Sequence, residues 1–150
     1  GFPELLELAA TLETETGKAI DDPAVRSHLA RFAVKASGLR YSAFRSMSAL
    51  SRGDQPGPEN SIGKLVAGQM MQDVARYALD LAGEAGLIQD ADAAIDGARF
   101  QAMLMRSPAT RIEGGSDEVL RNIIAERVLG LPPEIRVDKD VPYDAIPTGR

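Results

Sequence analysis

The chain has 150 residues, of which 44% are hydrophobic, and its formal net charge is −5. That length is sufficient for one domain with a packed core, whereas the lack of cysteine and the single histidine, His28, exclude disulfides and disfavour a metal centre. The acidic net charge and the scattered arginines are untypical of a nucleic-acid-binding protein.

The N-terminal residues carry no targeting pattern. Gly1 to Glu4 lack the basic and then apolar order of a signal peptide, and no apolar run reaches the roughly 18 residues of a membrane span. We therefore expect a soluble, cytoplasmic protein. Because the chain starts without methionine, directly in helix-like sequence, we also expect it to be a segment of a longer polypeptide.

Helical periodicity dominates the first half of the sequence. Residues 4–16 are expected to form a short helix that ends before Gly17. A long helix is expected from Pro23 to Arg52, because Asp22 is a favourable N-cap and proline is favoured at the first helical position. Its apolar residues have the three- and four-residue spacing of one buried face and comprise Val25, Leu29, Phe32, Ala36, Leu39, Ala43, Met47 and Leu50.

The second half continues this pattern. After a turn at residues 53–57, a second long helix, antiparallel to the first, is expected from residue 62 to an end near Gly83 or Gly86. A further helix is expected over residues 92–106, and a last one over residues 117–129. The residues expected on the buried side of the last helix are Val119, Leu120, Ile123, Ile124 and Val128.

These elements predict the fold class and the domain organisation. No β-alternation and no internal repeat is evident, so we predict an all-α, up-and-down helical bundle over residues 1–130. Residues 131–150 contain four prolines and several charges, and we expect them to form an extended tail.

A glycine hinge precedes the last predicted helix. Glu113, Gly114 and Gly115 are followed by Ser116, a favoured N-cap, and then by two acidic residues, the usual charge at a helix start. One interpretation is simply a well-formed helix N-terminus. The other is a catalytic or ligand-binding corner in which Glu113 acts as a base or an acceptor for ligand hydroxyls, because the three carboxylates disfavour an anion.

The glycine-rich stretch at residues 82–86 has two possible interpretations. It resembles a phosphate-binding loop in composition, but no strand precedes it, and Glu84, Asp90 and Asp92 would repel a phosphate. A helix C-cap at Gly83 followed by a polar turn explains the stretch better.

The residues from Gly114 to Pro132 carry a specific resemblance. The run Gly-Gly-Ser-x-Glu and the following Arg-Asn-Ile-Ile-Ala-Glu-Arg-Val-Leu-Gly-Leu-Pro are similar to the C-terminal signature of acyl-CoA dehydrogenases. The order of predicted helices from about residue 4 is similar to that family's C-terminal helical domain. The resemblance implies a three-part FAD enzyme of lipid metabolism and fatty acid β-oxidation, in which an N-terminal helical domain and a middle β-domain precede this bundle.

The family's chemistry sets expectations for cofactor and partners. A carboxylate removes the α-proton of an acyl-CoA thioester, while the β-hydrogen leaves as hydride to the flavin. FAD lies between subunits: the β-domain and C-terminal domain of one subunit hold its flavin end, and the neighbour's C-terminal domain holds its pyrophosphate and adenosine end. The resemblance therefore implies an oligomer, and we expect the isolated segment to bind no FAD and to be inactive.

The resemblance also implies roles for individual residues. Ser116 matches the family's usual threonine and Glu118 matches a glutamate or glutamine, and both positions contact the cofactor in relatives; Gly83 matches a glycine of the adenosine-side loop. In one large subgroup the base stands two residues before that threonine, which is Gly114 here, so Glu113 serves as base only if the turn shifts by one residue. Other subgroups place the base on an earlier helix, which would lie before Gly1.

Two departures from the family pattern concern the neighbour's cofactor. Where the family has Arg-x-x-Phe-Gly facing the pyrophosphate, this chain has Glu13 to Gly17, with a carboxylate in place of the guanidinium. In the adenosine-side loop, Asp80 replaces a glutamine and Glu84 replaces the second glycine. Such departures are typical of relatives that pair two different subunits, only one of which keeps the cofactor-binding residues.

Two functions follow from these expectations. The first is the C-terminal domain of a flavin-dependent acyl-CoA dehydrogenase, as the cofactor-degenerate subunit of a heteromer. The alternative is a non-catalytic helical oligomerisation domain of a dehydrogenase-like protein. In both cases, bundle faces that other domains would cover are expected to expose apolar surface and to favour self-association.

Overall fold

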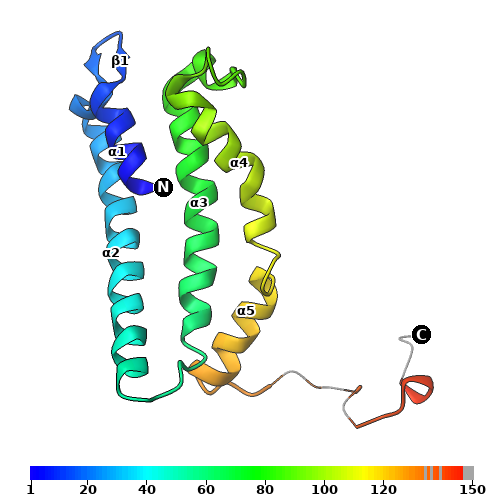
Figure 1. Ribbon diagram of the computed structural model, residues 1–150. Helices are drawn as coiled ribbons and strands as arrows, with labels where there is room; N and C mark the ends of the chain where they lie inside the picture. The colour runs from blue at the N-terminus through cyan, green and yellow to red at the C-terminus, as the bar shows by residue number, and fades with distance from the viewer. Residues whose placement is uncertain (134, 136, 139, 147–150) are drawn as a thin grey trace.

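The computed structural model has an all-α architecture with one short two-stranded ladder (Figure 1), and it describes residues 1–133, 135, 137–138 and 140–146. Two long helices, α2 (Pro23–Ser51) and α3 (Asn60–Ala82), run antiparallel. Helices α1 (Phe2–Thr11) and α4 (Arg99–Thr110) pack against them. The predicted all-α, up-and-down bundle is thereby confirmed.

Helix α2 begins where the sequence predicts. The Asp22 carboxylate accepts a hydrogen bond from the Ala24 backbone N–H at 2.7 Å, and Pro23 takes the first helical position. A short 3₁₀ turn, η1 (Ala19–Asp21), precedes this cap.

The predicted apolar stripe of α2 is buried only along its first half. Its buried residues are Val25, Leu29 and Phe32, whereas Met47 is 62% exposed and Leu50 is 55% exposed. Helix α1 lies beside the first half of α2 and does not reach the second (Figure 1). The second half therefore packs against fewer elements, and the prediction that the whole stripe is buried was wrong.

The first predicted helix ends five residues early. Two strands, β1 (Glu13–Thr14) and β2 (Gly17–Lys18), form a tight antiparallel hairpin where the sequence predicts the end of the helix and no strand. The Thr14 hydroxyl donates to the Gly17 carbonyl at 2.7 Å, and Gly17 has a φ of 116°. The β-branched threonines favour extended backbone, which explains why the helical prediction failed here.

The fourth helix begins later than predicted. A turn separates the 3₁₀ turns η2 (Gly83–Leu87) and η3 (Ile95–Ala98). In it, the Asp90 carboxylate accepts backbone hydrogen bonds from the N–H groups of Asp92 and Ala93, at 2.9 and 3.3 Å. Residues 96–98 have left-handed φ angles of 53°, 63° and 58°. These turns compete with helix formation, so α4 begins at Arg99 rather than at residue 92.

The last helix has two parts, α5 (Asp117–Ile123) and a π-helical turn, η4 (Ile124–Val128). Only Asp117 and Leu120 are buried on it, whereas Val119 is 50% exposed and Val128 is 37% exposed, contrary to prediction. Helix α5 packs mainly against α3, so only a narrow side is covered. Gly130, with a φ of 68°, ends the helical run as predicted.

The core and the tail occupy different parts of the molecule. The core forms where α1, the first half of α2, α3 and α4 meet, and it comprises Leu5, Leu8, Ala9, Val25, Leu29, Phe32, Met70, Val74, Ala78 and Phe100. Beyond residue 130, a 3₁₀ turn, η5 (Tyr143–Ala145), interrupts otherwise irregular backbone, and part of the predicted tail, residues 134, 136, 139 and 147–150, lies outside the described residues. The division into a domain of residues 1–130 and a tail of 131–150 stays a prediction. Within the described residues, no helix combines the length and apolarity that crossing a bilayer requires.

Candidate functional site

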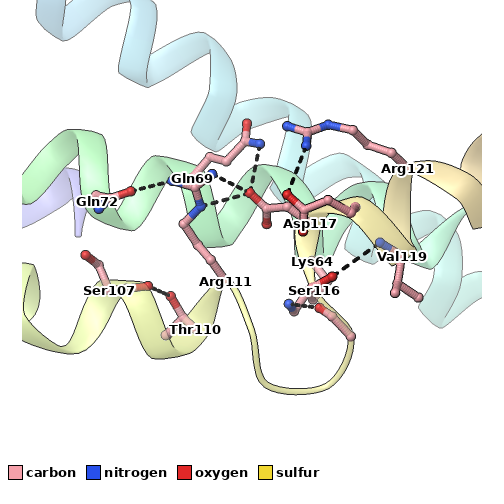
Figure 2. Close-up of polar contacts among 12 residues, drawn as sticks. Lys64, Gln69, Gln72, Ser107, Thr110, Arg111, Ser116, Asp117, Val119 and Arg121 are labelled. Carbon is pink, nitrogen blue, oxygen red and sulfur yellow. Dashed lines mark hydrogen bonds and ion pairs between the residues drawn. The ribbon is translucent and has the colours of Figure 1, made fainter.

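The glycine corner, residues 111–118, joins the end of α4 to the start of α5, beside the N-terminal half of α3 (Figure 2). Gly114 and Gly115 both have left-handed φ angles, 63° and 105°. Only glycine adopts these without strain, which explains the two glycines in the hinge. The Lys64 ammonium of α3 donates to the Gly115 carbonyl at 2.5 Å and ties the hinge to that helix.

Glu113, the candidate base, is an ion-pair partner in this structure. Both of its carboxylate oxygens accept a hydrogen bond from Nη2 of Arg106 at 2.8 Å. The two side chains are about half exposed, at 52% for Arg106 and 55% for Glu113. The guanidinium thus engages both oxygens of this carboxylate. The geometry therefore favours an ion-pair role for Glu113 over a basic one.

A second ion pair, Arg111 with Asp117, joins the two ends of the corner. Arg111 is the C-cap of α4, and Asp117 is the first residue of α5. The Arg111 Nε and Nη2 donate to the same Asp117 oxygen, Oδ2, at 2.8 and 2.6 Å, and Nη1 donates to the Gln72 side-chain carbonyl at 2.6 Å (Figure 2). The side chain of Asp117 is only 4% exposed, whereas that of Arg111 is 37% exposed.

The pKa of Asp117 follows from these contacts. Burial by itself would raise the pKa, but the hydrogen bonds from Arg111 and Gln69 and the positive charges of Arg111 and Arg121 outweigh it. The net result is a pKa below the usual value for aspartate. Asp117 is therefore ionised at neutral pH although it is buried.

Ser116 and Glu118, the two predicted cofactor-side residues, lie at the open side of the corner. Ser116 is the N-cap of α5, and its hydroxyl oxygen accepts the Val119 backbone N–H at 3.4 Å. The Glu118 side chain is 78% exposed and lies 3.9 Å from Arg121. Its own backbone N–H and the Ser116 hydroxyl hold the pKa of Glu118 below its usual value.

These pairings change the electrostatic interpretation of the corner. Glu113, Asp117 and Glu118 were expected to act together as unpaired negative charge, yet each has an arginine partner, namely Arg106, Arg111 and Arg121 respectively. The corner is consequently less acidic than the sequence implies, and the argument that three carboxylates exclude an anion loses much of its weight.

Gly83, the third predicted cofactor-side residue, lies far from the corner. It follows the C-terminal end of α3 with a φ of 59°, whereas Lys64, which contacts the corner, lies near the N-terminal end. The difference of nineteen in residue number corresponds to roughly 28 Å of helix. One chain therefore brings Ser116 and Glu118 together but leaves Gly83 at the opposite end of the bundle.

A pocket of about 240 Å³ adjoins the corner, and it is lined by Gln72, Pro108, Arg111, Ile112, Ser116, Asp117 and Glu118. It presents a hydroxyl, an amide, carboxylates and part of a guanidinium. The described residues contain no group of three or more histidine, cysteine or acidic side chains placed to hold a metal ion. The site is thus a recess of mixed polar and apolar lining whose polar groups are suited to hydrogen bonding.

Sequence reasoning missed the Arg111–Asp117 pair. Asp117 was interpreted as a solvated acidic residue of the first helical turn, the usual case. The available signal was the opposite charge six residues apart across a double-glycine hinge, because such a hinge can fold the two ends of the segment together. The partners on α3, Gln69 and Gln72, are 48 and 39 residues distant in sequence and carry no local signal.

Comparison with known proteins identifies the family. A family model described as "Acyl-CoA dehydrogenase, C-terminal domain" matches residues 1–129. The chain belongs to the acyl-CoA dehydrogenase family. The resemblance seen in the sequence is thereby confirmed over nearly the whole chain.

Curated acyl-CoA dehydrogenases provide the relatives in sequence. The chain is 37% identical over 132 residues to acyl-CoA dehydrogenase IpdE1 of Mycolicibacterium smegmatis, covering 88% of this chain and 30% of the relative. It is 36% identical over 118 residues to IpdE1 of Mycobacterium tuberculosis, covering 79% and 29%. The chain thus spans about a third of the length of these acyl-CoA dehydrogenases.

Solved structures share the fold of this chain. The ChsE4-ChsE5 complex from Mycobacterium tuberculosis matches with a TM-score of 0.75 and 28% identity, over 87% of this chain and 34% of that one. The structure named Tcur3481-Tcur3483 steroid ACAD matches with a TM-score of 0.74 over 88% and 33%. Its 22% identity supports likeness of fold alone.

Proposed function

We propose that this chain is the C-terminal bundle of an FAD-dependent acyl-CoA dehydrogenase subunit that introduces an α,β double bond into an acyl-CoA thioester in the cytoplasm. We further propose that the subunit is the cofactor-degenerate partner of a heteromer. Family membership supports the dehydrogenase part. The heteromer part rests on one observation, the acidic end of the bundle.

The two departures from the family pattern lie at the same end of the molecule. The β1–β2 hairpin lies near the start of α2, and the loop after α3 lies at the end of α3; these helix termini are at one end of the antiparallel pair (Figure 1). The stacking of His28 on Tyr77, with centroids 4.6 Å apart, joins the two helices there. The exposed carboxylates of this end include those of Glu13, Glu15, Asp80, Glu84, Asp90, Asp92 and Asp96.

This acidic end does not fit a pyrophosphate. Lys18 of the hairpin is exposed and Arg99 pairs with Asp96 at 3.3 Å, but the carboxylates outnumber these cations. A phosphate group approaching this end would therefore meet a net negative charge, without an arginine at the position where the resemblance implies one. The end of the bundle implied to hold a neighbour's cofactor is therefore unsuited to that role. In a heteromer, the other subunit would supply it.

The glycine corner fits the opposite end of the cofactor better. Ser116 and Glu118 border the recess together with Gln72 and the part-exposed Arg111. Such donors and acceptors suit the hydroxyl and carbonyl groups of a flavin. We propose that Ser116 and Glu118 hold FAD there, and that the cofactor, when bound, supplies the hydride acceptor.

The second half of α2 supports an oligomer. Tyr41, Phe44 and Met47 are 68%, 46% and 62% exposed on it. Large apolar side chains gathered on one exposed helix are typical of an interface. The structural relative ChsE4-ChsE5 is a complex of two differently named proteins, which is the arrangement that we propose here.

The dehydrogenase function is tested with the full-length polypeptide and a complementary subunit. Their mixture should reduce an artificial electron acceptor when an acyl-CoA is added, whereas the 150-residue chain should not. The thioesters tried should include steroid side-chain, fatty and branched acyl-CoA, because the sequence does not define the acyl group. If the FAD-loaded complex oxidises no thioester, the result contradicts the dehydrogenase function and supports the alternative, a non-catalytic oligomerisation domain.

Glu113→Gln is expected to leave turnover of that complex within roughly twofold of wild type, because we place the base outside these residues and Glu113 in an ion pair with Arg106. Loss of a general base lowers the rate by about 10²–10⁴-fold. The measurement is kcat with saturating acyl-CoA, with Glu84→Gln as a matched exposed control. A fall of that size in Glu113→Gln alone would identify Glu113 as the base after all.

A further inference from the structure

The Arg111–Asp117 pair encloses the whole hinge. Arg111 stands before it and Asp117 after it, and besides the side-chain contacts, the Asp117 backbone N–H donates to the Arg111 carbonyl at 3.1 Å. The segment between them is therefore a closed loop with both ends joined. The same guanidinium reaches Gln72, and Asp117 Oδ2 accepts a hydrogen bond from Gln69 at 3.4 Å, so the loop is also anchored to α3 (Figure 2).

The hinge has few other restraints. Glu113 and Gly114 are exposed, and the two glycines bring no side chain that could pack against the bundle. An added Cβ at Gly114 would meet no atom within 4 Å, so this glycine stands in open space, whereas one at Gly115 would lie 3.5 Å from the Leu120 side chain. Glycine backbone is intrinsically the most mobile, so the position of the hinge depends on its anchors. Those anchors are Lys64 at the Gly115 carbonyl, the half-exposed pair of Arg106 with Glu113, and the pair of Arg111 with the buried Asp117.

The burial of Asp117 exceeds what a helix start requires. An acidic residue in a first helical turn stabilises the helix from a solvated position. Asp117 is instead 4% exposed in its side chain, and its second oxygen, Oδ1, has no hydrogen-bond partner. Burying a carboxylate this way is costly unless an ion pair compensates it. The Asp117 carboxylate is therefore removed from water and held in one position by Arg111.

We propose that Arg111 and Asp117 are positioning residues that hold the Gly114–Gly115 hinge against α3 and thereby place Ser116 and Glu118 for the flavin. Asp117 lies between these two residues in the chain, so contacts that fix its position also restrict the backbone of both neighbours. The part of this inference that concerns the flavin rests on the proposed function. The part that concerns the hinge does not.

The hinge is tested on the 150-residue chain by NMR relaxation of the backbone amides. In Asp117→Asn, the order parameters of Gly114 and Gly115 should fall below about 0.6, while those of α3 stay near 0.85. Arg111→Lys keeps the positive charge but loses the planar fork, and it should give an intermediate loss. Asp73→Asn is the matched control, because Asp73 also pairs with a cation, Lys35 at 3.3 Å, but is 47% exposed.

Either of two results would overturn the hinge part. One is an unchanged order parameter at both glycines in both variants. The other is a loss spread evenly over the bundle, which would show that the pair contributes only to general stability. If Asp117→Asn does not fold, the milder Arg111→Lys decides between these outcomes.

The flavin part is tested in the full-length complex with its complementary subunit. Asp117→Asn should raise the FAD dissociation constant at least roughly tenfold, while kcat at saturating FAD is retained, and Asp73→Asn should change neither. An unchanged dissociation constant beside a mobile hinge would overturn the flavin part alone. If the wild-type complex binds no FAD, the proposed function fails, and the NMR measurement still decides whether the pair positions the hinge.

Discussion

Phe100→Ala is expected to lower the free energy of unfolding by about 4 kcal/mol, the largest effect of any single substitution considered. Phe100 is 2% exposed and is among the largest fully buried side chains of the described chain. It brings α4 into the same cluster as Leu5 of α1 and Val74 of α3. Truncation removes the transfer free energy of the ring and leaves a cavity that three helices would have to close.

Urea unfolding followed by circular dichroism measures this effect. The control is Met105→Ala on the same helix, which should cost less than about 0.5 kcal/mol, because Met105 is 77% exposed. Equal losses in the two variants would mean that α4 does not pack on the bundle by the face described.

Asp117→Asn is expected to lower the free energy of unfolding by about 2 kcal/mol at neutral pH, because a hydrogen-bonded charge on Arg111 loses its partner. The same substitution at the half-exposed Asp73 should cost at most about 0.5 kcal/mol. Thermal or urea unfolding of the three proteins gives the comparison. Equal costs at the two positions would contradict the burial and geometry of the Arg111–Asp117 pair.

The pH dependence of this difference follows from the lowered pKa of Asp117. A carboxyl with a folded-state pKa below its unfolded value, about 3.9, binds fewer protons in the folded state. Its stabilising contribution is complete above that unfolded pKa and is lost as pH falls through the folded pKa. The wild-type advantage over Asp117→Asn should therefore be constant from neutral pH to about pH 5 and shrink below about pH 4. An advantage that grows on acidification would contradict the lowered pKa.

The bundle could be predicted from the sequence because its signals are local. The N-cap at Asp22, the proline after it and the left-handed Gly130 each mark a helix end through their own backbone chemistry. Helical periodicity then gives element type for long segments such as α2 and α3. Predictions failed where turn chemistry competes over a few residues, as in the hairpin of Thr14 and Gly17.

Burial was harder to predict than helicity. The apolar spacing of α2 continues to Leu50, but periodicity states only that residues share a face, and not whether another element covers that face. In α5 and η4 the same reasoning placed Val119 and Val128 inside, although both are at least 37% exposed. Coverage depends on which elements come together, and those contacts are long-range.

The candidate site divides in the same way. The hinge glycines and the Ser116 cap were predictable, since each follows from backbone conformation at its own position. The partners of the corner were not, because Arg111 and Asp117 meet through a fold of the hinge and through side chains of α3. The assignment of Ser116, Glu118 and Gly83 to the cofactor stays a proposal.

The central proposal is that this chain belongs to a subunit that depends on a different subunit to retain FAD. The most direct measurement is the flavin content per polypeptide, by absorbance, of the full-length protein purified alone and after coexpression with a complementary subunit. We predict little or no flavin on the protein alone and a stoichiometric amount on the complex. Stoichiometric FAD on the protein purified alone would contradict the proposal, because the acidic end of the bundle would then not prevent a second copy from completing the site.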